Sequence, residues 1–283
     1  RDVSSFLFIC LNMLDCYLLV ENLLYADYMT KTLDLQGKYH FSVDDVFEEM
    51  LRISDCGGVL FDSPVFAFFK EMHDLYGAHI YLYLFYEKDI DGKIRSLKDI
   101  RSFKEELSSI DWIHYAPHAQ SFEIIPFNQT IADFENVCEN IYQEIERISG
   151  KKIFASIIRL HFYSEMYEMA EYFLSKNVTA LYTTDKPVGA YRLPEECRKL
   201  LVSKGVTFFN GIHFLRTQFR VENFTGERLL DQEIRENFLK SLHDFGCITL
   251  YSHEYELHRS EVRNVARRCF RILNEIQLKS VIQ

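Results

Sequence analysis

The chain has 283 residues, of which 48% are hydrophobic and 26% charged, and its formal net charge at pH 7 is -10. This composition suits a globular protein with a large core. The negative charge argues against a nucleic-acid binder, because affinity for phosphate depends on Lys and Arg releasing counterions. No membrane span is predicted, since polar residues interrupt the apolar stretch 6–24 and a span needs about 20 apolar residues in a row.

Seven cysteines are scattered singly along the chain, without a CxxC pair. Such an odd, unpatterned set predicts reduced, buried thiols and a reducing compartment, so we expect the protein in the cytoplasm. The first residue is Arg rather than Met, so the true N-terminus can lie upstream. Residues 1–36 are expected to form an amphipathic helical extension.

From residue 37 onward, strands and helices are predicted to alternate. The first strand, at 39–43, ends in Asp44 and Asp45, and a helix is expected from about Val46. The next helix, at 64–76, has a proline where a first helical residue belongs and a glycine after its end. Strand 79–86 follows and has almost no polar position, as expected for a strand covered on both faces.

The same unit repeats to the end of the chain. Helices are predicted at 96–109, 131–149, 164–175, 194–204, 229–243 and 262–276, and strands at 112–115, 153–160, 179–184, 212–221 and 247–252. This alternation is typical of a parallel sheet, and about seven units suffice to close it into a barrel. We therefore expect a single α/β domain over 1–283, with the fold of a (β/α) barrel.

Ionisable residues follow the predicted strands, at the ends where such barrels carry their functional groups. Asp44 and Asp45 come first, and two adjacent carboxylates can take different tasks, one on a metal and one as a base. The alternative is that they cap the following helix. His114 and His118, four residues apart after the third strand, could converge on one ion with Asp45; the alternative is a pair of ordinary core or surface histidines.

Two His and one carboxylate with open positions suit zinc, and also nickel, cobalt, manganese or iron. Further along, Arg159 ends an apolar strand and would need a carboxylate partner there. Asp185, at the end of the next strand, is the natural candidate; a structural ion pair and an active-site role are about equally supported. His253 ends the last strand; a lone histidine is more often structural than catalytic, but its position on the same rim as the other residues favours a functional role.

In order and spacing, these residues resemble the motifs of the polysaccharide deacetylase family, of the chitooligosaccharide deacetylase type. The matching segments, between about 39 and 257, read HFSVDD, HYAPH, IIRLHFY, LYTTD and LYSH. The resemblance implies a distorted seven-stranded (β/α) barrel and a divalent metal, zinc in the first place. The sequence departs from the family pattern at Val46, Tyr115 and Leu160–His161, and no Trp follows Asp185.

The resemblance also implies a role for each residue. Asp44 would be the general base, His253 the general acid, and a backbone N–H near Phe162 would bind the oxyanion. Arg159 would orient Asp44, and Asp185 would hold Arg159. Asp45, His114 and His118 would bind the metal.

We thus expect a metal-dependent hydrolase that removes N- or O-linked acetyl groups from a carbohydrate. The alternatives are an amidohydrolase of the same fold acting on a small non-carbohydrate amide, and a barrel that binds glycan without catalysis. The oligomeric state cannot be inferred from the sequence.

Overall fold

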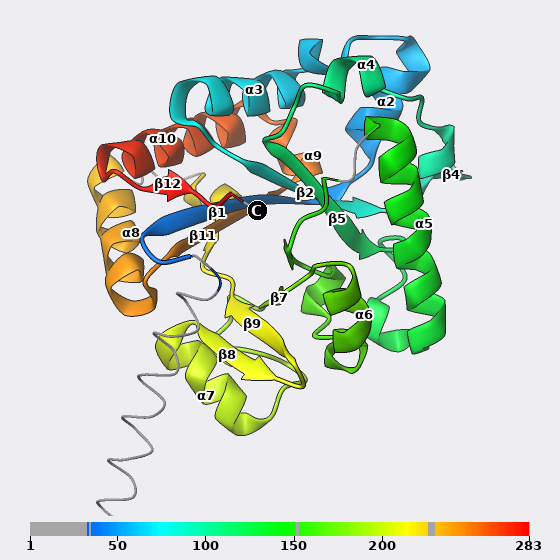
Figure 1. Ribbon diagram of the computed structural model, residues 1–283. Helices are drawn as coiled ribbons and strands as arrows, with labels where there is room; N and C mark the ends of the chain where they lie inside the picture. Colours follow the sequence, from blue (N-terminus) through cyan, green and yellow to red (C-terminus); the bar gives the residue numbers. More distant parts are fainter. Residues whose placement is uncertain (1–32, 34, 151–152, 226–229, 283) are drawn as a thin grey trace, which may run out of the picture.

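The computed structural model describes residues 33, 35–150, 153–225 and 230–282. Its largest sheet is parallel and has β1 near its middle (Figure 1). In spatial order it contains β10 (Phe219–Arg220), β11 (Ile248–His253), β1 (Lys38–Val46), β2 (Ile80–Phe85) and β5 (Ile113–Ala119), and β12 (Lys279–Ser280) pairs with the start of β1.

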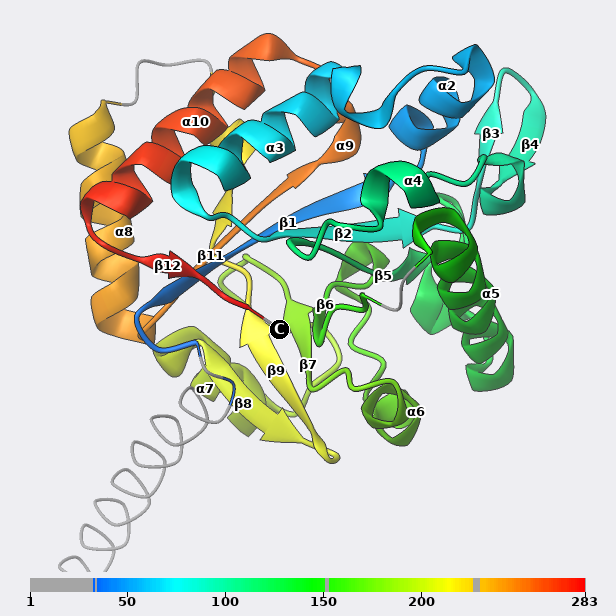
Figure 2. The same cartoon turned by 45° about the horizontal axis from the view of Figure 1, so that its top comes forward.

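A second sheet lies beyond β5, and Figure 2 shows it beneath the first. It consists of β6 (Ile157–Ile158), β7 (Ala180–Thr183), β9 (Ile212–Arg216) and β8 (Val206–Phe209), with only β8 antiparallel to its neighbour. A parallel bridge between Tyr115 and Phe154 joins the two sheets. The predicted α/β architecture with parallel strands is therefore confirmed, and the described strands form two linked sheets rather than a closed ring.

Helices cover the outer faces of the sheets (Figures 1 and 2). They are α2 (Glu48–Cys56), α3 (Pro64–Tyr76), α4 (Lys104–Leu107), α5 (Ile131–Ser149), α6 (Ala170–Ser175), α7 (Glu195–Lys204), α8 (Asp231–Phe245), α9 (Glu254–Leu257) and α10 (Ser260–Glu275). A small hairpin of β3 (Glu87–Ile90) and β4 (Lys93–Ser96) lies apart from both sheets.

Local sequence signals account for the best-predicted elements. The Ser63 hydroxyl accepts a hydrogen bond from the Phe66 N–H at the start of α3, and Gly77 ends the helix in the left-handed conformation. On α10, Phe270 packs edge-on against Phe41, at 5.1 Å between ring centroids, and against Tyr39 at 5.9 Å. These contacts hold α10 against β1, the strand that carries Asp44 and Asp45.

Five predicted elements differ in extent. The helix expected at 164–175 is a 3-10 turn at Tyr167–Met169 followed by α6, and the strand expected at 212–221 is divided between β9 of the second sheet and β10 of the first. The helix expected at 96–109 is a 3-10 turn at Leu97–Asp99 followed by the four-residue α4. The strand expected at 153–160 is reduced to the bridge at Phe154 and the two residues of β6. The third strand is longer than predicted, because β5 runs through Pro117 to Ala119.

The predicted extension at 1–36 lies outside the described residues, apart from Leu33, Leu35 and Gln36. Within the part of the chain that is described, no helix has both the length and the apolar character to cross a membrane. The five cysteines of that part are free thiols, and three of them are buried.

Candidate active site

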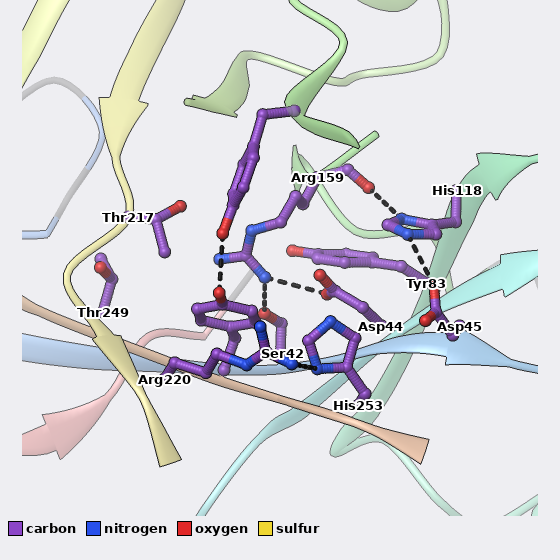
Figure 3. A network of polar contacts seen from close by, with 12 residues as sticks. Ser42, Asp44, Asp45, Tyr83, His118, Arg159, Thr217, Arg220, Thr249 and His253 are labelled. Atoms are coloured by element: carbon purple, nitrogen blue, oxygen red, sulfur yellow. Dashed lines mark hydrogen bonds and ion pairs between the residues drawn. The ribbon is translucent and has the colours of Figure 1, made fainter. Parts of the chain in front are cut away.

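The carboxyl ends of β1, β5, β6 and β11 meet around a cavity of about 270 Å³. Of the residues singled out in the sequence, Asp44, Asp45, His118, Arg159 and His253 line it. Figure 3 shows their side chains pointing toward one another from different strands. The rim of strand ends predicted from the sequence therefore does bring these five side chains together.

Asp45 leaves the regular path of its strand. The pairing of β1 with β2 shifts between Val43 and Val46, as in a β-bulge, and Asp45 has a left-handed backbone with φ of 60°. A bulge re-aims side chains, and Asp tolerates this conformation better than most residues. The bulge thus lets both carboxylates, adjacent in sequence, face the same cavity.

Asp45 forms a buried cluster with His118 and with His161, a residue that the sequence reasoning had not assigned to the site. His118 Nε2 lies 3.1 Å and His161 Nδ1 3.6 Å from the same oxygen, Asp45 Oδ1. The two ring nitrogens are 3.3 Å from each other. One carboxylate oxygen and two imidazole nitrogens therefore converge on one point.

The hydrogen bonds behind each ring indicate which nitrogen carries the lone pair. His118 Nδ1 lies 2.7 Å from the carbonyl oxygen of Arg159, and His161 Nε2 lies 3.0 Å from that of Phe122. A carbonyl oxygen only accepts, so each of these nitrogens must donate its N–H. The other nitrogen of each neutral ring then presents a lone pair to Asp45, whose Oδ1 is buried without a hydrogen-bond donor.

The charges of the cluster favour a positive charge at this point. Burial alone would lower the pKa of His118, but the adjacent carboxylates of Asp45 and Asp44, which favour the protonated ring, outweigh it and raise that pKa. Burial would likewise raise the pKa of Asp45, and His118 lowers it instead. Burial and the neighbouring His118 lower the pKa of His161 to about 4. The site can therefore hold a proton on His118 or a metal cation between the three residues.

The prediction that His114 joins Asp45 and His118 is wrong. Both histidines belong to β5, and four residues of extended chain span about 13 Å, so they cannot converge on one ion as they could in a turn. His114 is instead buried in the interior, where its Nε2 lies 2.9 Å from His79 Nδ1 and its ring stacks on Tyr81. Pro117, between the two histidines, also lies within the strand.

Arg159 is fully buried and forms its ion pair with Asp44. Its Nη1 donates to Asp44 Oδ1 at 2.9 Å and to the Ser42 hydroxyl at 2.8 Å. The guanidinium also lies over the rings of Tyr251 and Tyr182, with its central carbon 4.2 and 4.6 Å from the ring centroids. Two aromatic faces and one carboxylate thus compensate the buried charge.

The prediction that Asp185 holds Arg159 is wrong. Asp185 follows β7 and lies 3.8 Å from the ammonium of Lys186. It lines a different cavity, of about 260 Å³, together with Arg216 and Lys240. The carboxylate that pairs with Arg159 therefore belongs to β1 rather than to the next strand along the chain.

His253 is held by a carboxylate that the sequence did not reveal. Its Nδ1 lies 2.5 Å from Glu222 Oε1, and Arg220 Nε donates to the same oxygen at 3.0 Å. Burial would raise the pKa of Glu222, but the bond with His253 lowers it. Because Nδ1–H donates to Glu222, the other ring nitrogen of His253 is the one available to a ligand.

The alternative interpretation of the two aspartates, as a cap of the following helix, is also wrong. The residue at the N-cap position of α2 is Phe47, which offers no side-chain acceptor. The carboxylate of Glu254 accepts from the first N–H groups instead. Asp44 and Asp45 are therefore free of this structural task.

His161 could have been suspected from the sequence, whereas Glu222 and Glu254 could not. His161 follows Arg159 by two residues at a strand end, where the segment departs from the family pattern. Its backbone neighbours Phe162 and Tyr163 have φ of 51° and 50°, a strained conformation for side-chain-bearing residues that is often found at functional sites.

No family model matches the sequence, and no curated protein matches it either. Among solved structures, the chain is similar to the 4-α-glucanotransferase from Thermococcus litoralis, with a TM-score of 0.55 and 11% identity over 86% of this chain and 37% of that one. The chain thus spans little more than a third of that enzyme. At this identity the likeness concerns the fold alone.

Two deacetylases are also among the structures to which the chain is similar. The catalytic domain of peptidoglycan N-acetylglucosamine deacetylase from Eubacterium rectale has a TM-score of 0.42 and 10% identity, over 88% of this chain and 89% of that one. A candidate polysaccharide deacetylase from Mycobacterium smegmatis has a TM-score of 0.46 and 10% identity, over 84% and 83%. The activity has to be inferred from the side chains of the site itself.

A double-mutant cycle tests the partner of Arg159. Arg159→Met should lower the free energy of unfolding by about 3–5 kcal/mol, because it leaves Asp44 buried without its partner. In the Asp44→Asn background the same change should cost less, whereas in Asp185→Asn it should cost as much as in the parent protein. Urea unfolding of the variants gives these values; an equal cost in all three backgrounds would show that Asp44 and Arg159 are not coupled.

Acid sensitivity tests the placement of His114. Burial and the nearby His79 lower its pKa to about 4, against about 6.5 in an unfolded chain. The neutral His114 ring therefore contributes fully to stability above pH 6.5, and this contribution is lost as the pH falls toward 4. In the parent, the free energy of unfolding should fall between pH 7 and 4.5 as His114 becomes protonated in the unfolded chain. In His114→Phe this fall should be smaller by about 2–3 kcal/mol.

The control is His243→Phe, which removes a histidine whose side chain is 88% exposed and paired with Asp244, and it should not reproduce the smaller fall expected for His114→Phe. Parallel curves for His114→Phe and the parent would contradict the burial of a neutral His114.

Proposed function

We propose that this protein is a metal-dependent hydrolase that removes acetyl groups, N- or O-linked, from a carbohydrate. The observation that carries the proposal is the convergence of Asp45, His118 and His161. Three acceptor atoms within 3.6 Å of one another repel unless a positive charge lies between them. The carbonyl oxygens behind both imidazoles fix the lone pairs in this direction, as outer partners do in metal sites.

The donor set fits a divalent metal. Two imidazole nitrogens and one carboxylate leave positions open for substrate, the arrangement of catalytic zinc sites; nickel, cobalt, manganese or iron are also compatible with it. Asp45, His118 and His161 would hold the ion. When bound, it would supply Lewis acidity to a carbonyl group and to a water molecule.

The remaining residues of the cavity match the tasks of amide or ester hydrolysis. Arg159 occupies Asp44 Oδ1, which directs the other carboxylate oxygen to accept a proton from water. Glu222 accepts from Nδ1–H of His253, so the other ring nitrogen of His253 is left to donate a proton to the leaving group. Register pairing places Asp44 and His253 opposite each other on neighbouring strands, which suits a base and an acid acting on one bond.

The cavity mouth supports a sugar substrate. Phe122, Phe162 and Tyr255 line the cavity and are 49%, 51% and 46% exposed. Exposed aromatic faces around a polar cavity can stack on the apolar faces of sugar rings. The backbone N–H near Phe162 would take the oxyanion, as the motif resemblance implies.

Metal binding tests the ligand set. The parent protein should bind about one zinc ion per chain, and His118→Ala and His161→Ala should each lose more affinity than the ~10–100-fold typical of removing an outer partner. His114→Phe is the matched control and should keep the parent affinity. Affinities are measured by competition with a chromophoric chelator. If His114→Phe releases zinc and His161→Ala retains it, the ligand set proposed here is wrong.

The two aspartates should separate metal binding from catalysis. Asp44→Asn and His253→Ala should keep the metal and lose about 10²–10⁴-fold in activity, because they remove proton transfer only. Asp45→Asn should lose both. The assay is acetate release from acetylated chitooligosaccharides, acetylated xylan and simple amides, with metal content measured for each variant.

The substrate panel separates the remaining alternatives. Turnover of simple amides alone would favour a non-carbohydrate amidohydrolase. Saccharide binding by a protein that holds metal but releases no acetate would favour a non-catalytic glycan-binding barrel. Release of acetate from the parent and not from Asp44→Asn is the outcome that the proposed mechanism requires.

A further inference from the structure

Glu254 directly follows His253 and is fully buried at the start of α9. Its carboxylate accepts three backbone hydrogen bonds from a segment more than 200 residues earlier. The N–H of Phe47 donates to Oε2 at 3.0 Å, that of Glu48 to Oε2 at 2.8 Å and that of Glu49 to Oε1 at 3.1 Å. One side chain therefore satisfies the first N–H groups of α2, which a helix cannot satisfy internally.

This bond set spans the two chain segments that carry the candidate catalytic groups. Asp44 and His253 are the last paired residues of β1 and β11, so the ladder between the strands ends with them. Beyond that point Asp45 turns into the left-handed conformation. Glu254 contacts the chain two residues after Asp45, and it thereby fixes the far end of this strained turn to the strand that carries His253.

We infer that Glu254 is a positioning residue, which sets the direction of the Asp45 side chain relative to His253 by capping α2 from the neighbouring strand. The inference rests on the proposed function, in which Asp45 of this turn is a metal ligand. A carboxylate suits this task because its two oxygens accept all three N–H groups. An amide in its place offers one oxygen and an NH₂ group, which would oppose a backbone donor.

The experiment compares Glu254→Gln with Glu106→Gln. Glu106 is the matched control, because its carboxylate also joins distant segments, accepting from the N–H of Leu60 and from Arg101 Nη2, and it does not line the cavity. Both variants should lose thermal stability. Only Glu254→Gln should show faster hydrogen exchange in peptides covering 44–50, and only it should lose zinc affinity, by about tenfold or more, as expected for an outer partner.

Glu254→Asp serves where the Gln variant fails to fold, since it keeps the charge and should fall between parent and Gln in both measurements. Unchanged exchange at 44–50 in Glu254→Gln would overturn the inference, and so would faster exchange with unchanged zinc affinity. Absence of zinc binding in the parent protein would overturn the proposed function instead, and hydrogen exchange alone would then decide whether Glu254 fixes this turn.

Discussion

The candidate active site depends on one electrostatic constraint. Two imidazole lone pairs and a carboxylate oxygen face one another in a buried space. Carbonyl oxygens behind the rings of His118 and His161 fix their orientation, so the rings cannot turn away without losing hydrogen bonds. The arrangement is stable when a positive charge lies between the three groups. Asp45 and Asp44 raise the pKa of His118, so a proton on this ring can meet that need, as can a divalent cation, whose binding would compete with the proton.

Elsewhere around the cavity, each buried ionisable group is likewise paired with a group of opposite charge or with aromatic rings. Arg159 is buried against Asp44 and between two tyrosine rings, and His253 is paired with Glu222. Asp44 and His253, which the proposed reaction would use, are thus each oriented by a residue from a distant segment of the chain. Such pairing costs stability unless the geometry is good, and it holds the groups ready for proton transfer.

Sequence patterns predicted the fold better than the partners within the site. The helix at 64–76 and the strand at 79–86 carry their own caps and apolar patterns, and both form nearly as expected. The site residues Asp45 and His118 follow from their place at strand ends. His161 was missed because spacing along the chain favoured His114, and a four-residue step has a different reach in a strand than in a turn. Contacts between distant segments, such as Glu222 with His253, leave no mark on local sequence.

The origin of the three candidate ligands also has a mechanical consequence. Asp45 and His118 belong to strands of the first sheet, whereas His161 follows β6 of the second, and a bridge of Tyr115 with Phe154 joins the sheets nearby. A cation bound by all three residues would link the two sheets to each other. Separating the sheets would then require its release, which adds about 2.7 kcal/mol at a hundredfold excess over the dissociation constant. The concentration of free metal would in this way affect the stability of the fold, in addition to its role in the proposed reaction.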